Sequence, residues 1–216
     1  VGRMGLNRWL GCIENPRTGR ESEGVGTVRL TTKPKSVMVV GAGPAGLQAA
    51  IAAVHGAMSV HDPASELSRL NASAHLAPVP VSPALLTVLR AALHFAEDSD
   101  GAFDPVVGGR LTALGLLPAS RVLAAPGAGW RDLRIDDRGR VQFRQPLRLD
   151  VGGIAKGYAV DCAIEVLRAA GVLEAQVNAG GDLRVFGAAA QTIALRDPRA
   201  PSRCSQRLEL HDQALA

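Results

Sequence analysis

The stretch LDVGGIAKGYAV, residues 149–160, groups residue types that suit a phosphate ligand. Asp150 precedes Gly152 and Gly153, and Lys156 follows them in what the pattern predicts to be the first turn of a helix. Bare glycine backbone lets a ligand approach closely, and a lysine at a helix N-terminus adds positive charge that favours an anion. The alternative is a strand-to-helix turn that needs glycine sterically, in which Asp150 caps the helix and Lys156 is solvated.

A second glycine-rich stretch, VMVVGAGPAGLQAA at residues 37–50, matches the G-x-G-x-x-G pattern of a dinucleotide-binding loop through Gly41, Gly43 and Gly46. A β-rich run precedes the glycines, an alanine-rich helix pattern follows, and Asp62 supplies the acid that the pattern requires about 20 residues on. The residues after Asp62 predict helix and broken loop instead of further parallel strands. A working dinucleotide site and a fragment of one therefore both stay open.

The elements that position these residues follow from periodicity and turn signals. Ser82-Pro83 has the composition of a helix start, and the apolar spacing after it predicts a helix to Ser99. The other predictions are a strand, turn and helix over 36–58, a polar turn or short helix over 64–71, loops with short helical turns over 101–130, a hairpin over 133–144 with Leu147 and Leu149 continuing its strand, a helix from about Lys156 to a stop at Gly171, a second hairpin over 175–187 and a strand at TIALRDP. This order of elements predicts an α+β fold.

Composition limits the classes of protein that the chain can belong to. An apolar fraction of 47% supports a core, while a net charge of +4 carried on scattered residues does not indicate a nucleic-acid surface. Three cysteines, Cys12, Cys162 and Cys204, are too few for a disulfide framework and form no metal-type pair. Neither a signal peptide nor a transmembrane run is evident, so we expect a cytoplasmic location for the chain as it stands.

Four motifs resemble, in the same order, those of the ApbE family of FAD:protein FMN transferases. They are AAIAAVHGAMSVHDPASELSRLN, SDGAFDPVVGGRLTALGLLP, LDVGGIAKGYAVDCAIEVL and VNAGGDLRVFG. The resemblance implies a magnesium-dependent enzyme that takes FAD as substrate, transfers FMN to a threonine or serine of a target protein and releases AMP. Members are often exported from the cytoplasm.

The resemblance also implies roles for individual residues. FAD is expected to contact His61, Ala102, Phe103, Asp104, Asp150 and Lys156, and the Gly153 backbone to contribute to a magnesium site. Each role has an alternative, since Phe103 can be a core anchor, Asp104 can cap a turn and His61 can be a surface histidine. NAGGD, residues 178–182, is either a second backbone approach to the ligand or a plain hairpin turn, and Asp161 is expected to be structural. No catalytic base is assigned.

Residues 3–50 resemble another family. GCIENPRTGRES followed by KPKSVMVVGAGPAGLQAA is similar to the junction of the barrel and flavin domains in the 2,4-dienoyl-CoA reductase and NADH:flavin oxidoreductase family. Cys12 stands at a cluster cysteine of that family, without its companions. We therefore expect an oxidoreductase-like segment over 1–46 and an ApbE-like domain over 47–216, incomplete at both ends and lacking the remaining magnesium ligands.

These resemblances give three hypotheses for function. The first is an FMN transferase, whose activity the missing ends would weaken or abolish. The second is a fragment of an FAD- or NAD(P)-dependent oxidoreductase that uses Gly41, Gly43 and Gly46. The third is a flavin-binding protein without catalysis.

Overall fold

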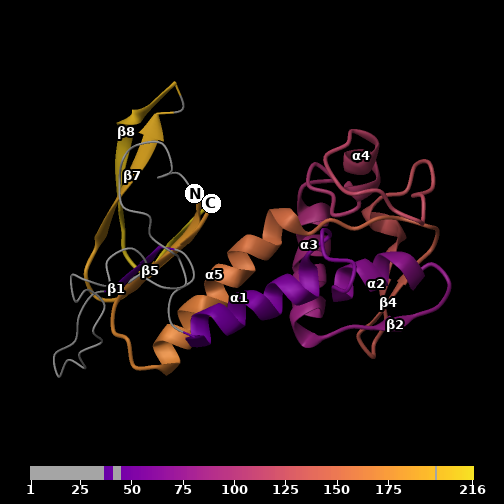
Figure 1. Cartoon of the computed structure of the whole chain (residues 1–216), viewed down its shortest axis with the longest axis horizontal. Coiled ribbons are helices and arrows are strands. Elements are labelled where there is room, and N and C mark those ends of the chain that lie inside the picture. Colours follow the sequence, from indigo (N-terminus) through magenta and orange to yellow (C-terminus); the bar gives the residue numbers. More distant parts are fainter. Residues whose placement is uncertain (1–36, 41–44, 198) are drawn as a thin grey trace, which may run out of the picture. The chain divides into compact units, whose positions relative to one another are not determined.

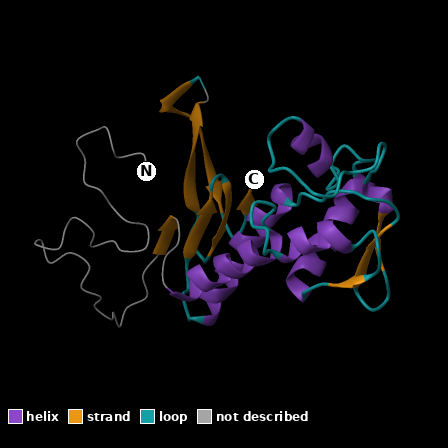
Figure 2. Ribbon diagram, turned by 45° about the vertical axis from the view of Figure 1, so that its right-hand side comes forward, coloured by secondary structure: helices purple, strands orange, loops and turns teal. Residues whose placement is uncertain are grey.

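A computed structural model describes residues 37–40, 45–197 and 199–216 of the chain (Figure 1). The chain divides into two compact units, called here unit 1 (Val1–Ala50 and Val160–Ala216) and unit 2 (Ile51–Ala159). Long strands belong to unit 1, whereas unit 2 combines helices with long loops (Figure 2). The predicted α+β class is confirmed.

Unit 2 is built from helices and a small antiparallel sheet in the order β2-β4-β3. It holds most of α1 (Ala45–Met58), all of α2 (Glu66–Ser73), α3 (Pro83–Asp98) and α4 (Gly108–Ala113), the strands β2 (Val79–Pro80), β3 (Leu133–Ile135) and β4 (Arg140–Phe143), a 3-10 turn at Trp130–Asp132, and the start of α5 (Gly152–Ala169). The predicted hairpin, the short helix near 64–71 and the short helical turn within 101–130 are all confirmed.

Serine caps start two helices of unit 2, and the sequence predicts the one at Ser82. The Ser82 hydroxyl accepts from the Leu85 N–H at 3.3 Å, with Pro83 in the first turn of α3. The Ser65 hydroxyl does the same for α2 by accepting from the Ser68 N–H at 3.0 Å. Each cap satisfies a backbone donor that the helix leaves unpaired, so the helix starts are fixed locally.

The segment Leu147–Val151 is not the continued strand that the sequence predicts. Leu147 and Leu149 are 1% and 0% exposed, but neither belongs to a strand. The reason is that Asn71 takes the place of a partner strand: its side-chain Nδ2 donates to the Leu149 carbonyl at 3.0 Å and its Oδ1 accepts from the Leu149 N–H at 2.8 Å. Both backbone groups of Leu149 are thereby satisfied inside the core, as burial requires.

Unit 1 contains a four-stranded sheet in the order β1-β5-β6-β9 and a two-stranded sheet, β7-β8. Its strands are β1 (Val37–Val40), β5 (Ala175–Ala179), β6 (Asp182–Phe186), β7 (Gln191–Asp197), β8 (Ala200–Leu210) and β9 (Ala214–Leu215). β1 is parallel to β5, while β6 is antiparallel to β5 and to β9. Leu183, Val185, Ile193 and Leu210 form a buried cluster on these strands.

Turn glycines of unit 1 lie where the sequence predicts them. Gly171 follows α5 with a φ of 77°, and the Val172 N–H donates to the Leu167 carbonyl, which is a typical helix C-terminus. Gly180 and Gly181 form the β5–β6 turn with positive φ values. In the described part of the chain, no helix is both long and apolar enough to cross a membrane.

The Asn71 contact generates a stability prediction. Asn71→Asp removes the amide donor and places a carboxylate beside the Leu149 carbonyl, so we expect a loss of about 1–3 kcal/mol in the free energy of unfolding at pH 7. Burial raises the folded-state pKa of the new carboxyl above its unfolded value, and the protonated acid can donate again. The deficit relative to the parent should therefore shrink as the pH falls through that raised pKa and grow as the pH rises through it.

Urea unfolding of parent and variant between pH 4 and pH 8 measures this effect. Asn178→Asp is the matched control, because the Asn178 Oδ1 accepts from the Gly181 N–H at 3.1 Å and an aspartate can do the same. We expect the control to change the stability by less than about 0.5 kcal/mol. Equal stability of Asn71→Asp and the parent at pH 7 would contradict the role of Asn71.

Candidate functional site

Two of the glycine-containing motifs, residues 101–109 and 148–153, meet in unit 2. The Asp150 N–H donates to the Pro105 carbonyl at 2.8 Å. A Cβ on Gly108 would lie only 2.6 Å from the Arg148 carbonyl oxygen, and a Cβ on Gly153 would lie 3.2 Å from Cε2 of Phe103. Glycine is therefore required sterically at Gly108, where the two segments touch through their backbones.

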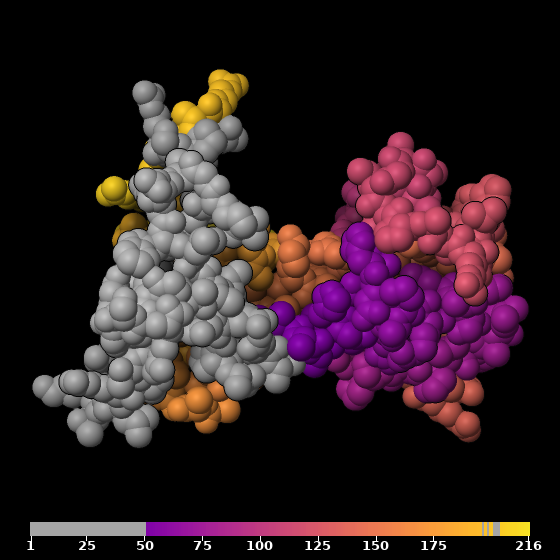
Figure 3. All heavy atoms as spheres, viewed as in Figure 1, coloured from indigo at the N-terminus to yellow at the C-terminus, as the bar shows by residue number. Residues whose placement is uncertain are grey.

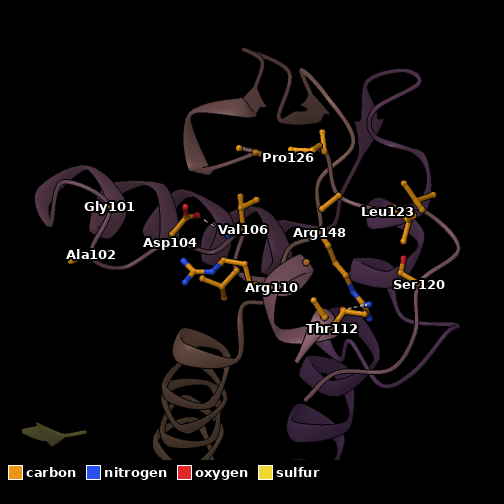
Figure 4. A pocket seen from close by; sticks show the side chains of 18 residues that line it. Gly101, Ala102, Asp104, Val106, Arg110, Thr112, Ser120, Leu123, Pro126 and Arg148 are labelled. Carbon is orange, nitrogen blue, oxygen red and sulfur yellow. Dashed lines mark hydrogen bonds between the residues drawn. The ribbon is translucent and has the colours of Figure 1, made fainter. Parts of the chain in front are cut away.

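Asp104 lies at the edge of a cavity of about 730 Å³, called here the Asp104 cavity (Figure 4). Its Oδ1 accepts from the Val106 N–H at 2.8 Å, which is the turn cap that the sequence leaves as an alternative. Ala102 and Arg110 also line the cavity. Residues 101–128, most of its lining, form a lobe on the surface of unit 2, magenta in Figure 3.

Phe103 is half-buried and packs edge to face on Phe95, with 6.4 Å between the ring centroids. Its ring also lies close to Gly153, where an added Cβ would lie 3.2 Å from Cε2 of Phe103. These contacts fit the alternative of a packing anchor, and they place the phenylalanine against the first turn of α5. The expected contact of Phe103 with FAD stays a prediction.

Asp150 stands directly before α5, which begins at Gly152, earlier than the sequence predicts. Its Oδ1 accepts from the Gly152 N–H at 2.9 Å and so holds the first turn of the helix. Lys156 is exposed in the next turn. The carboxylate and the lysine thus lie at the helix N-terminus, where the backbone dipole favours an anion.

His61 lines a second cavity of about 520 Å³, called here the His61 cavity. The imidazole is exposed, and its backbone N–H donates to the Ser59 hydroxyl at 3.3 Å. The residues common to the lining of both cavities are Ser120, Val122 and Arg148. His61 is therefore not grouped with Asp104 directly, and Arg148 lies at both cavities.

Arg148 is the residue of this site that the sequence analysis missed. It is 7% exposed, and its Nη1 donates to the Thr112 hydroxyl at 2.5 Å and to the Pro118 carbonyl at 2.7 Å (Figure 4). Burial lowers the pKa of the Arg148 guanidinium, and the negative charge of Asp150 acts in the opposite direction. Its only sequence signal was a charge between two leucines, which in a strand would have pointed to solvent.

Several other candidates have local structural roles. Asp161 forms an ion pair with Arg184 at 2.6 Å, as its predicted structural role requires. NAGGD forms the hairpin turn of β5 and β6, and the Asp62 Oδ1 accepts from the Ala64 N–H at 2.8 Å before α2. Gly46 lies within α1, while Gly41, Gly43 and Cys12 lie outside the described residues.

Metal-binding side chains do not cluster in the described part of the chain, where no group of three or more His, Cys, Asp or Glu could hold an ion. Magnesium does not require such a cluster, because it commonly takes one or two protein oxygens and completes its shell with phosphate and water. The Gly153 carbonyl and the Asp150 carboxylate supply hard oxygen atoms at the start of α5. The donor chemistry therefore fits magnesium bound together with a phosphate ligand.

Comparison with known proteins agrees with the arrangement of these motifs. The sequence profile of the ApbE family matches residues 25–216. The chain belongs to the ApbE family. An FAD:protein FMN transferase of Rhodobacter capsulatus is 35% identical over 132 residues, which are 55% of this chain and 25% of the relative. One of Chlamydia trachomatis is 32% identical over 168 residues, 72% of this chain and 51% of the relative.

A crystal structure of the ApbE protein of Thermotoga maritima matches with a TM-score of 0.69 and 29% identity, over 78% of this chain and 60% of that one. The ApbE-like fold predicted from the sequence is thus confirmed. This chain spans about half or less of the length of the two curated relatives named above.

The resemblance of residues 3–50 to dienoyl-CoA reductases is not supported, since the ApbE match itself begins at residue 25. The described strands agree with this result. β1 has a parallel neighbour in β5, but β5–β6 and β6–β9 are antiparallel, unlike the parallel series of a dinucleotide-binding sheet. The division at residues 46 and 47 stays a prediction.

The contact between the two motifs of this ApbE chain can be tested at Gly108. Gly108→Ala drives a Cβ into the Arg148 carbonyl, so we expect the free energy of unfolding to fall by about 1–3 kcal/mol in urea titrations. Gly56→Ala is the control, because a Cβ there meets nothing within 4 Å inside α1. That change should raise the stability by about 0.5–1 kcal/mol. A Gly108→Ala protein as stable as the parent would rule out the close backbone contact.

Proposed function

We propose that this chain is an FAD:protein FMN transferase, a magnesium-dependent enzyme that transfers FMN from FAD to a threonine or serine of a target protein and releases AMP. The observation that carries the proposal is the meeting of residues 101–109 with residues 148–153 beside the Asp104 cavity. Both segments are motifs for which the family resemblance implies FAD contacts. Membership of the ApbE family and the similarity to FAD:protein FMN transferases support the same activity.

The reaction breaks the phosphoanhydride bond of FAD and forms a phosphoester bond to the acceptor. The hydroxyl oxygen of the acceptor forms a bond to the phosphorus on the FMN side of FAD, and the bond from that phosphorus to the AMP oxygen breaks. AMP leaves with the bonding electron pair, and the hydroxyl proton passes to a base that remains unassigned. Such transfers depend mainly on positioning and on stabilisation of charge.

The chain's own residues would bind and orient the dinucleotide. Asp150 would accept a hydrogen bond from FAD while its Oδ1 holds the Gly152 N–H, and Lys156 would add positive charge near the diphosphate. Asp104, Ala102 and Phe103 would hold the ligand at the Asp104 cavity, and His61 would stack on a ring. Magnesium at the Gly153 carbonyl would, when bound, neutralise charge on the diphosphate.

A transfer assay tests the proposed activity. The 216-residue chain is incubated with FAD, magnesium chloride and an acceptor domain that carries the target threonine, and the proteins are then separated under denaturing conditions. We expect a fluorescent band at the mass of the acceptor, since flavin bound through a phosphoester survives denaturation. EDTA, riboflavin in place of FAD, and an acceptor with threonine changed to valine should each abolish the band.

No band, while a characterised transferase labels the same acceptor in parallel, would contradict the proposal. If FAD still stabilises the chain in that case, the chain is a flavin-binding protein without transferase activity under these conditions.

Asp150 gives a sharper test of the site. In Asp150→Asn the amide oxygen can still accept from the Gly152 N–H, so we expect the melting temperature without ligand to change by less than about 2 °C. The variant should lose most of the stabilisation that saturating FAD gives the parent, since a ligand stabilises by binding only the folded form. Thermal unfolding with and without FAD measures both quantities.

Asp161→Asn, within α5, is the matched control, because Asp161 is engaged with Arg184. Its FAD-dependent shift should equal that of the parent. If FAD stabilises Asp150→Asn and the parent equally, Asp150 is only the helix cap and contributes nothing to the ligand.

A further inference from the structure

Arg148 is a buried cation without an anionic partner in the described part of the chain. None of the ion pairs found there involves its guanidinium. Its two hydrogen bonds both come from Nη1 and go to neutral acceptors, the Thr112 hydroxyl and the Pro118 carbonyl. Nε and Nη2 donate to no described residue.

Such an arrangement is costly unless something else balances the charge. Taking a guanidinium out of water is unfavourable, and neutral acceptors offset only part of the cost. The Asp150 carboxylate attracts Arg148 electrostatically without pairing with it. The hydrogen bonds to Thr112 and Pro118 tether these two residues, but neither acceptor carries a negative charge that would balance the guanidinium.

The location of Arg148 indicates what balances it. It lines the Asp104 cavity and the His61 cavity together with Ser120 and Val122, so a group at Arg148 is within reach of both. A dinucleotide consists of two ring systems joined by a diphosphate, so it matches two cavities that share Arg148 in their lining. Arginine is also the residue best suited to bind phosphate oxygens, because its planar fork of N–H donors matches them.

We infer that Arg148 is a specificity-determining residue that binds a phosphate group of a nucleotide where the Asp104 and His61 cavities meet. Identification of that nucleotide as FAD, with the diphosphate at Arg148, rests on the proposed function. The inference that Arg148 binds a phosphate group does not depend on the proposed function. Ser120, which lines both cavities, offers a hydroxyl to the same group.

Binding measurements with paired ligands test this inference. The parent chain, Arg148→Met and Arg148→Lys are titrated with AMP and FAD, which carry phosphate, and with adenosine and riboflavin, which do not. We expect Arg148→Met to bind AMP and FAD about 10- to 100-fold more weakly, as loss of a charge-assisted hydrogen bond predicts. The affinities for adenosine and riboflavin should change less than about twofold.

Arg148→Lys keeps the charge but not the fork, and its affinity for AMP should lie between those of the parent and Arg148→Met. If Arg148→Met does not fold, Arg148→Lys tests the role of Arg148 instead. It should bind AMP more weakly than the parent does and bind adenosine equally well. Arg90→Met removes an exposed arginine of unit 2 that lines neither cavity and should bind AMP as the parent does.

Thr112→Val separates binding from tethering, because it removes one acceptor of Nη1 and leaves the guanidinium in place. It should retain most of the affinity for AMP. The inference is overturned if Arg148→Met binds AMP as the parent does, if Thr112→Val loses as much affinity as Arg148→Met, or if phosphate-free ligands weaken equally.

The transfer assay distinguishes this inference from the proposed function. A parent chain that labels no acceptor but binds AMP through Arg148 contradicts the transferase and supports the phosphate site. A parent chain that labels the acceptor, with an Arg148→Met variant whose KM for FAD is unchanged, supports the transferase and overturns the role of Arg148.

Discussion

The buried segment Leu147–Val151 is the constraint on which the rest of unit 2 depends. It crosses the core without a partner strand, so each of its backbone polar groups must be satisfied by another part of the unit. Asn71 of α2 holds Leu149, the Pro105 carbonyl accepts from the Asp150 N–H, and just before the segment the Pro146 carbonyl accepts from the Ala125 N–H. One segment therefore ties a helix and two loops together, and these are the elements that carry the candidate site.

The same constraint explains why sequence reasoning found the elements but not their connections. The helix start at Ser82, the stop at Gly171 and the hairpin turns are determined by residues close together in the chain, so local patterns predict them. The alternation in LRLD fits a strand equally well, and only the distant Asn71 decides against it. No local rule predicts a contact across 78 positions in the chain.

Site residues show the same difference between local and distant information. Motif resemblance selected Ala102, Asp104, Asp150 and His61, and the structure places the first three near one another but puts His61 at a separate cavity. Arg148 escaped notice because an arginine between leucines is expected to face water. Its burial follows from Thr112 of α4 and Pro118 of the following loop, which supply acceptors from a stretch that the sequence predicts only as loops with short helical turns.

Structural and ligand roles need not exclude each other at Asp104 and Asp150. Each carboxylate uses Oδ1 to hold a backbone N–H two residues on, at Val106 and Gly152, which fixes the direction of the side chain. A phosphoryl transfer gains most from groups that are already in place when the substrate binds, because the chemistry itself asks little of the protein. A carboxylate held by its own turn, next to a buried guanidinium tethered by Thr112 and Pro118, is preorganised in this sense. The bonds that look merely structural then limit how far these charged groups move, while the guanidinium itself would bind the nucleotide phosphate.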